Sequence, residues 1–550
     1  MELLPVEVII KIASHLPRAV SDEDARLVRP GIASISRKWQ SVVEEHTFRK
    51  LKITNTELPK FASIFSAPQS HRRALLKSLN FSIILPTYTD QECGIFETNE
   101  DRAANDKFAS EAVYGLFTIL SSWGPDPAIG LSLSFDIHSP MDCEHRGYPK
   151  YRQDSRDAKY GNRQDLFGKR YKYSYIRLTH PDKSLPEVPC IAGTLEFWKA
   201  FEGADDQRNV HPCSQAALAL TKAPRVQNLV WGYREPGVYL PLRRAMRQEF
   251  VQYLDTLRLG PFINAFEFEL RSRWYLHYHR LPNLVFPHEQ DPLPSALHRL
   301  IASAENLRSV TYKGQADASL FWPYPAGQEP SQPLWPSVTD LSVKFDYRAP
   351  NGQWYLQARP PGYWADSDDL NNEDYPDEPV VDRHDGDEPL PFDTASHMPP
   401  GYGSAQETRD AVSYEISLQK YTSMDGTHNG AHDFRTWPND ATILPLLAAF
   451  ARAIAHMPSL KFADLSTPLE RSGDGSSAGE WSVFYSAPGS HSGYDKYMKG
   501  GPNLSAPRVF FHVEDWRPSK KVLDLFREVG RKYHGQETVI TFMPWQYYIW

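Results

Sequence analysis

The chain has 550 residues, four widely spaced cysteines and a formal net charge of −8 at pH 7. This length corresponds to about two to four domains or to one extended repeat array, and the mild acidity argues against a dedicated nucleic-acid-binding protein, which would usually be basic. The absence of a CxxC pair, a signal-peptide-like start and a long apolar run excludes a zinc ribbon, a redox pair and a membrane span, and predicts a cytoplasmic or nuclear protein.

Residues 1–17 have the pattern of an amphipathic helix. Pro5 stands where a first-turn proline is tolerated, and Glu7 favours the positive end of the helix dipole. The apolar residues recur at three- and four-residue steps and therefore share one face. They are Val8, Ile9, Ile12 and Leu16. After a charged linker, a second predicted helical segment begins near Ile35 and carries the large aromatic Trp39.

This arrangement resembles the F-box, the short helical module that docks a protein onto the Skp1 adaptor of a cullin ubiquitin ligase. The resemblance lies in the Leu-Pro-x-Glu-Val start, the apolar stripe, the closing Leu-Pro and the later Ser-Arg-Lys-Trp run. The linker at 18–30 is longer and more charged than in most F-boxes. The resemblance implies that residues 1–50 bind Skp1 through Leu4, Pro5, Val8, Ile9, Ile12, Leu16, Ile35 and Trp39. The alternative is an ordinary amphipathic helical hairpin.

From residue 51 onwards, a pattern of the form apolar-x-x-apolar-x-apolar recurs. Its copies begin at Leu76, Ala128, Val226, Ile263, Leu307, Val338 and Leu460. Amphipathic helical stretches precede most copies, for example Leu242–Leu257 and Leu297–Ala304. A helix, a short turn and a strand of this spacing form the unit of leucine-rich-repeat proteins, in which the strands stack in parallel along a concave face.

Residues 51–550 are therefore expected to form an α/β fold, an irregular leucine-rich-repeat-like solenoid that recognises a substrate. Trp231, Phe268, Tyr312 and Val343 should lie in one stacked series, and the exposed strand positions between buried ones should contact the substrate. The copies are spaced irregularly, whereas true repeats have a period of roughly 20–29 residues. Another α/β or α+β assembly is the alternative.

Three stretches interrupt the pattern and are expected to be loop insertions, because they are rich in charged residues or in glycine and serine and poor in apolar ones. They span about 140–185, 360–410 and 470–507. The first is also rich in tyrosine and arginine, but its aspartates and the overall acidity favour a solvated loop over a nucleic-acid site.

Five later segments are informative when they are taken together with the N-terminus. They are Leu185–Ile191, Phe321–Pro323, Pro350–Tyr355, Met457–Leu460 and Val513–Pro518. They resemble a group of filamentous-fungal F-box proteins whose C-terminal region has no assigned function. The resemblance implies a substrate-receptor subunit of an SCF-type (Skp1-cullin-F-box) ubiquitin ligase, which bridges Skp1, and through it a cullin, to an unknown target protein. It implies a recognition protein rather than an enzyme, and a Skp1-binding scaffold outside a ligase is the alternative. The sequence has no P-loop, no dinucleotide-binding motif after a strand and no HExxH, so no cofactor or metal is expected, and the lack of a long apolar run predicts no membrane partner.

Two short strings suggest other chemistry. Gly489–Gly493 matches the GxSxG nucleophile elbow after a predicted apolar strand, Trp481–Tyr485, so a serine hydrolase using Ser492 is a further alternative. The residues that follow are rich in glycine and tyrosine and do not predict the helix that this elbow requires. His428 and His432 are separated by Asn-Gly-Ala, which predicts a loop rather than a metal-binding helix.

Overall fold

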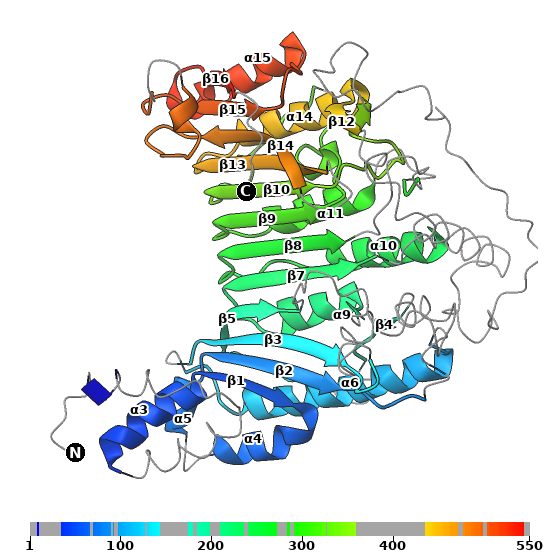
Figure 1. Ribbon diagram of the computed structural model, residues 1–550, viewed down its shortest axis with the longest axis vertical. Coiled ribbons are helices and arrows are strands. Elements are labelled where there is room, and N and C mark those ends of the chain that lie inside the picture. The colour runs from blue at the N-terminus through cyan, green and yellow to red at the C-terminus, as the bar shows by residue number, and fades with distance from the viewer. Residues whose placement is uncertain are drawn as a thin grey trace, which may run out of the picture. The chain divides into compact units, whose positions relative to one another are not determined.

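The computed structural model shows a mixed α/β protein with a large, mostly parallel sheet (Figure 1). The residues that the structure describes are 8, 9, 11, 35–66, 70–89, 92, 97–126, 129–142, 174–179, 184–197, 209–235, 240–271, 283–285, 291–325, 327–358, 435–470, 477–498 and 503–543. The chain divides into two compact units. The first comprises Met1–Gly94, Glu100–Gly168 and Tyr175–Val230, and the second comprises Ile95–Asn99, Lys169–Ser174 and Trp231–Trp550.

In the first unit, neighbouring strands of the sheet are parallel and follow the order β1, β2, β3, β5, β7. These strands are β1 (Lys50–Thr54), β2 (Ser78–Ile84), β3 (Leu131–His138), β5 (Ile191–Glu196) and β7 (Asn228–Arg234), the last of which continues into the second unit. The helices are α3 (Arg37–Phe48), α4 (Leu58–Ile64), α5 (His71–Leu75), α6 (Asn99–Ser121) and α9 (Pro212–Ala217), with a short 3-10 helix η1 (Asn55–Glu57) and a π-helical turn η5 (Leu218–Lys222).

The second unit begins with alternating helices and parallel strands. Its helices are α10 (Leu240–Leu254), α11 (Pro292–Ala302), α14 (Asp440–Ile454), α15 (Lys520–Glu528) and α16 (Arg531–His534), with 3-10 helices η6 (Ala318–Leu320) and η8 (Asp495–Tyr497). Its main strands, in sheet order, are β8 (Ala265–Arg271), β9 (Ser309–Gly314), β10 (Asp340–Phe345), β13 (Phe462–Glu470), β14 (Ser477–Ser486), β15 (Arg508–His512) and β16 (Val539–Phe542). A separate antiparallel pair is formed by β11 (Leu356–Ala358) and β12 (Arg435–Pro438).

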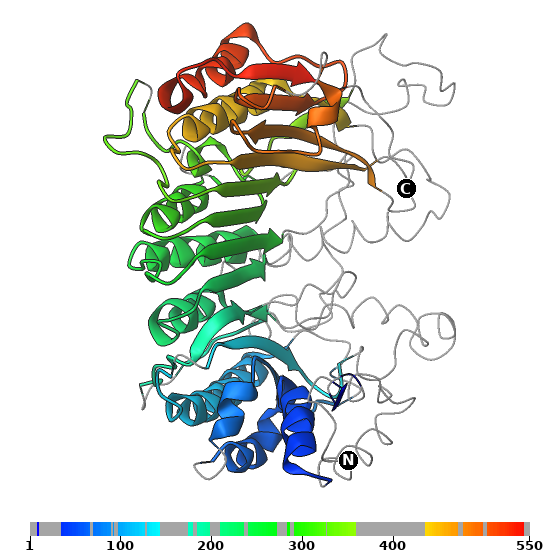
Figure 2. The ribbon, with the colours of Figure 1, turned by 90° about the vertical axis from the view of Figure 1, so that its left-hand side faces the viewer.

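The apolar pattern of the sequence locates the inner strands of this unit. Phe268 of β8 is opposite Tyr312 of β9, which is opposite Val343 of β10, and all of these pairs are parallel. The ring centroids of Trp231 and Phe268 are 5.6 Å apart, and those of Phe268 and Tyr312 are 6.0 Å apart. The predicted parallel pairing and the predicted stacked series are therefore confirmed. Figure 2 shows the green helices α10 and α11 on one side of these strands. The buried ring of Trp231 packs against Phe250 of α10, with 5.3 Å between the ring centroids, so the buried side chains face this side.

The close spacing of β8 and β9 requires a glycine at the end of β9. Gly314 has φ +137°, and a Cβ atom there would lie 2.5 Å from the carbonyl oxygen of Leu270. Any other residue type would place its Cβ in this contact and would have to move the backbone. The positive φ is a second reason, because glycine alone adopts this conformation readily.

The end of the sheet departs from the parallel arrangement. β14 is antiparallel to both β13 and β15, and β16 returns to parallel pairing with β15. The expected loop at 470–507 is therefore wrong for Ser477–Ser486, where Trp481, Val483 and Tyr485 alternate into the core and stabilise a strand. The glycine- and serine-rich flanks dominate the composition of 470–507, although the apolar run Trp481–Tyr485 within it predicts a strand.

Part of the expected insertion at 140–185 is also ordered. Tyr175–Ile176 forms β4, which pairs in parallel with β6 (Asn209–Val210). The backbone of 177–179 is held by side chains of α6, because Arg177 N donates to Asp106 Oδ1 and Thr179 N donates to Ser110 Oγ. The expected insertion at 360–410 lies outside the described residues. Within the part of the chain that is described, no helix has the length and apolarity needed to cross a membrane.

Candidate functional site

The N-terminal residues predicted to bind Skp1 fall into three groups. Ile9 and Trp39 are packed inside the chain, with exposed fractions of 0% and 4%. Val8 and Ile35 are exposed, at 40% and 42%. The remaining ones lie outside the described residues: Leu4, Pro5, Ile12 and Leu16. The surface that a partner would meet on the described part of this segment is therefore apolar at Val8 and Ile35.

Helix α3 is fixed to the first unit on its buried side. Ser36 caps it by accepting a hydrogen bond from Trp39 N, and the indole of Trp39 lies inward. Near its end, Glu44 accepts a hydrogen bond from Arg72 on α5 at 2.6 Å. Burial alone would raise the pKa of Glu44, but the hydrogen bonds from Arg72 and other neighbours lower it. Ile35, immediately before the cap, is thus held in a defined position rather than on a free end.

A second candidate surface is the face of the sheet in the second unit that lies opposite α10 and α11, which we call the polar face. Between the buried positions of successive strands, Glu267, Thr311, Ser342 and Asp464 are directly opposite one another and form one row. Lys313 Nζ lies 2.6 Å from Glu267 Oε1 on this face. These are the intervening strand positions that the sequence predicts as substrate contacts, and that role stays a prediction.

A buried ionic network occupies the carboxyl ends of β7 and β9. Glu235 follows β7 and accepts hydrogen bonds from Arg243 and Arg247 of α10, and Arg247 also donates to Asp291, the N-cap of α11. Both arginines donate to Gln315 Oε1, at 2.8 and 3.0 Å. Burial alone would raise the pKa of Glu235, but the two arginines hold it below its usual range. All five side chains are buried, so the network joins elements and is not open to a ligand.

Nothing in the amino-acid pattern connects these residues. Arg243 and Arg247 are one turn apart on α10 and could have been noted as charges within an otherwise apolar helix. Their partners lie on other elements, more than forty residues away in the case of Asp291. Next to the network, the pKa of Asp317 is raised to about 6 by burial and by Asp291.

The GxSxG string does not form a nucleophile elbow. Ser492 N donates to Asp495 Oδ2 at 2.8 Å, and the Ser492 hydroxyl is buried without a hydrogen-bond partner among the described residues. The short η8 follows, where a hydrolase would have a packed helix. Asp495 Oδ1 lies 3.1 Å from Arg508 Nε, and His534 lies beside the hydroxyl of Tyr485. These contacts stabilise a turn and provide no base for Ser492.

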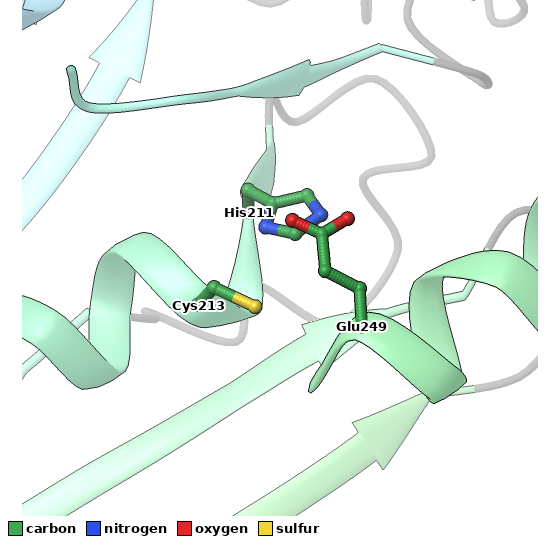
Figure 3. A group of neighbouring side chains, drawn as sticks. All are labelled: His211, Cys213 and Glu249. Atoms are coloured by element: carbon green, nitrogen blue, oxygen red, sulfur yellow. The ribbon is translucent and has the colours of Figure 1, made fainter. Parts of the chain in front are cut away.

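Figure 3 shows His211, Cys213 and Glu249, whose side chains are of the types that ligate transition metals. His211 and Cys213 belong to the first unit, at the start of α9, whereas Glu249 lies on α10 of the second unit. Arg177 Nη2 lies 3.1 Å from His211 Nε2, and because a guanidinium can only donate, this nitrogen already uses its lone pair. We assign no metal site to this group. The sequence signal for it is only the His-Pro-Cys string.

The comparisons with known proteins give no family. No family model matches the chain, and a search of curated proteins finds no match.

Proposed function

We propose that this chain is an F-box substrate receptor of an SCF-type ubiquitin ligase, in which residues 1–50 bind a Skp1-like adaptor and the α/β region presents a target protein. The N-terminal motif supplies the hypothesis, and one observation in the structure supports it. Among the described residues, three large hydrophobic side chains are exposed: Val8, Ile35 and Phe262. Two of the three belong to the small set that the F-box resemblance assigns to the Skp1 interface.

Exposed apolar side chains of this kind are typical of a surface that a partner covers. A helical segment that docks into a groove gains most of its affinity from a few apolar anchors, which are solvent-exposed until the partner binds. Ile9 and Trp39, by contrast, are packed within the chain and would support the interface from behind. We propose, further, that the parallel strands and outer helices form a leucine-rich-repeat-like array, whose polar face is the receptor surface.

The proposal is tested with the double variant Val8→Asp, Ile35→Asp in a binding assay with purified Skp1. Loss of the two anchors removes roughly 2–3 kcal/mol of apolar burial, and each new carboxylate adds a desolvation cost, so Kd should rise about a hundredfold or more. The matched control is Phe262→Asp, which changes an exposed apolar side chain in the second unit. Its Kd should be that of the unmodified chain.

Two outcomes would refute the proposal: no binding of Skp1 by the unmodified chain, or equal binding by the double variant and the control. Trp39 is a poor choice for this test, because its burial means that replacement would perturb the fold. Reconstitution of the chain with Skp1, a cullin and the ubiquitin-transfer enzymes distinguishes a substrate receptor from a Skp1-binding scaffold. A substrate receptor supports ubiquitin transfer in this mixture, whereas a scaffold binds Skp1 without transfer.

A further inference from the structure

One part of the polar face combines aromatic rings with a carboxylate. Phe462 and Asp464 lie two residues apart on β13 and therefore project to the same side, and Asp464 is directly opposite Phe484 of β14. We call these three residues the Asp464 patch. Each of them is partly exposed, whereas Leu465, on the other side of the strand, is fully buried. The rings of Phe462 and Phe484 are 6.0 Å apart, and Tyr494 packs against Phe484 at 4.9 Å.

The carboxylate of this patch has a cation, Lys344, in its neighbourhood, which lowers its pKa without forming an ion pair with it. Within the described residues, Asp464 accepts one hydrogen bond, from Ser466 Oγ at 3.1 Å, and it forms no ion pair. The nearest neighbouring pair on the face, Lys344 and Glu480, is loose, with 3.8 Å between Nζ and Oε1. Burial, and then repulsion from Glu480, raise the pKa of Asp464 to about 7. A partly desolvated carboxylate that has no directly paired cation is costly, so a cation that paired with Asp464 would be bound favourably.

We propose that the Asp464 patch binds a lysine or arginine side chain of the target protein, an inference that rests on the receptor function proposed above. The carboxylate of Asp464 would pair with the ammonium or guanidinium group, and Glu480 adds a second negative charge nearby. Phe462 and Phe484 would cover the aliphatic stem and place ring faces near the cation, an arrangement that favours cation–π contact. The recognised segment of the target is therefore basic.

Binding of a cation at this patch is coupled to a proton. Asp464 must be ionised in the complex, whereas about half of the free chains carry the proton near neutral pH. Affinity should therefore rise by about tenfold between pH 6 and pH 8, since the proton no longer has to be displaced.

The test measures the fluorescence anisotropy of two labelled nonapeptides as the full chain is added. One peptide carries three arginines and the other three citrullines on the same Gly-Ser spacer. Citrulline has the shape of arginine without its charge. At pH 8, the arginine peptide should bind at least tenfold more tightly than the citrulline peptide. Asp464→Asn should weaken its binding about tenfold and remove the pH dependence, and Phe484→Leu should weaken it several-fold. Asp524→Asn, which removes one negative charge from the surface of α15, should leave binding unchanged.

Equal binding of the two peptides, no measurable binding of the arginine peptide, or equal effects of Asp464→Asn and Asp524→Asn would overturn the inference. Thermal unfolding of each variant shows whether it is folded. If Asp464→Asn does not fold, Phe484→Leu provides an independent test of whether the patch binds the peptide. The Skp1 assay distinguishes the two proposals. If the chain binds Skp1 but not the arginine peptide, the receptor proposal stands and the proposal for the Asp464 patch is refuted. If it binds the arginine peptide but not Skp1, the patch binds cations and the receptor proposal is refuted.

Discussion

Arg247 offers a direct test of how the second unit is held together, because it donates to three acceptors in a buried network. Replacement of Arg247 by Met keeps much of its volume but leaves Asp291 without its arginine and Glu235 with only Arg243. Removal of one partner from a buried ionic group typically costs about 3–5 kcal/mol, since an uncompensated charge stays buried. Urea unfolding, followed by circular dichroism, should show a loss of this size in the free energy of unfolding.

The matched control is Arg299→Met on α11. Arg299 pairs with Asp255 at 2.6 Å, but both side chains are about half exposed, and exposed pairs contribute at most about 1 kcal/mol. The double variant Arg247→Met, Asp291→Asn should recover part of the loss, because asparagine removes the orphaned charge and can still cap α11. If Arg247→Met costs no more than Arg299→Met, or if Asp291→Asn gives no recovery, the network does not stabilise the unit as described.

Two further predictions concern stability. Gly314→Ala should lower the free energy of unfolding by about 2–4 kcal/mol in urea, because its Cβ would collide with the backbone of Leu270. The control Gly489→Ala, at a positive φ with open space around it, should lower it by about 1 kcal/mol, and equal losses would contradict the steric reason. Burial lowers the pKa of His298 to about 4, below the value of about 6.5 in an unfolded chain. Between these pH values the unfolded state binds more protons than the folded state. The free energy of unfolding should therefore fall by up to about 3 kcal/mol as the pH drops from 6.5 to 4. His298→Gln should flatten this dependence in urea midpoints measured at pH 7.5 and pH 5, and an unchanged slope would exclude His298 as its source.

The inner strands of the second unit could be predicted because their signal is local. Phe266 and Phe268, or Val310 and Tyr312, alternate with polar residues, and each pair is buried in a strand as expected. Strand direction is not a local property. The pattern beginning at Leu460 predicted β13, but nothing nearby shows that β14 would approach it in the antiparallel sense.

The charged interior was beyond sequence reasoning for a related reason. Whether an arginine such as Arg243 is buried depends on the partners that the fold brings to it, and Glu235 and Gln315 come from two different strand ends. The predicted Skp1 residues show the same limit. A shared helical face places Val8 and Ile9 on one segment, but the packing of the unit decides that Val8 is exposed and Ile9 is buried.

The parallel pairing of β10 with β13 has a consequence for the order in which the strands pair during folding. Roughly 115 residues, including β11, β12 and α14, separate the two strands, so their pairing joins parts of the chain that are distant in sequence, and such contacts form slowly. The antiparallel pair β13 and β14, in contrast, is joined by a short connection and can form early. Pairing of β13 with β10 is therefore expected to follow formation of the β13–β14 pair and to be a slow step in the folding of the second unit.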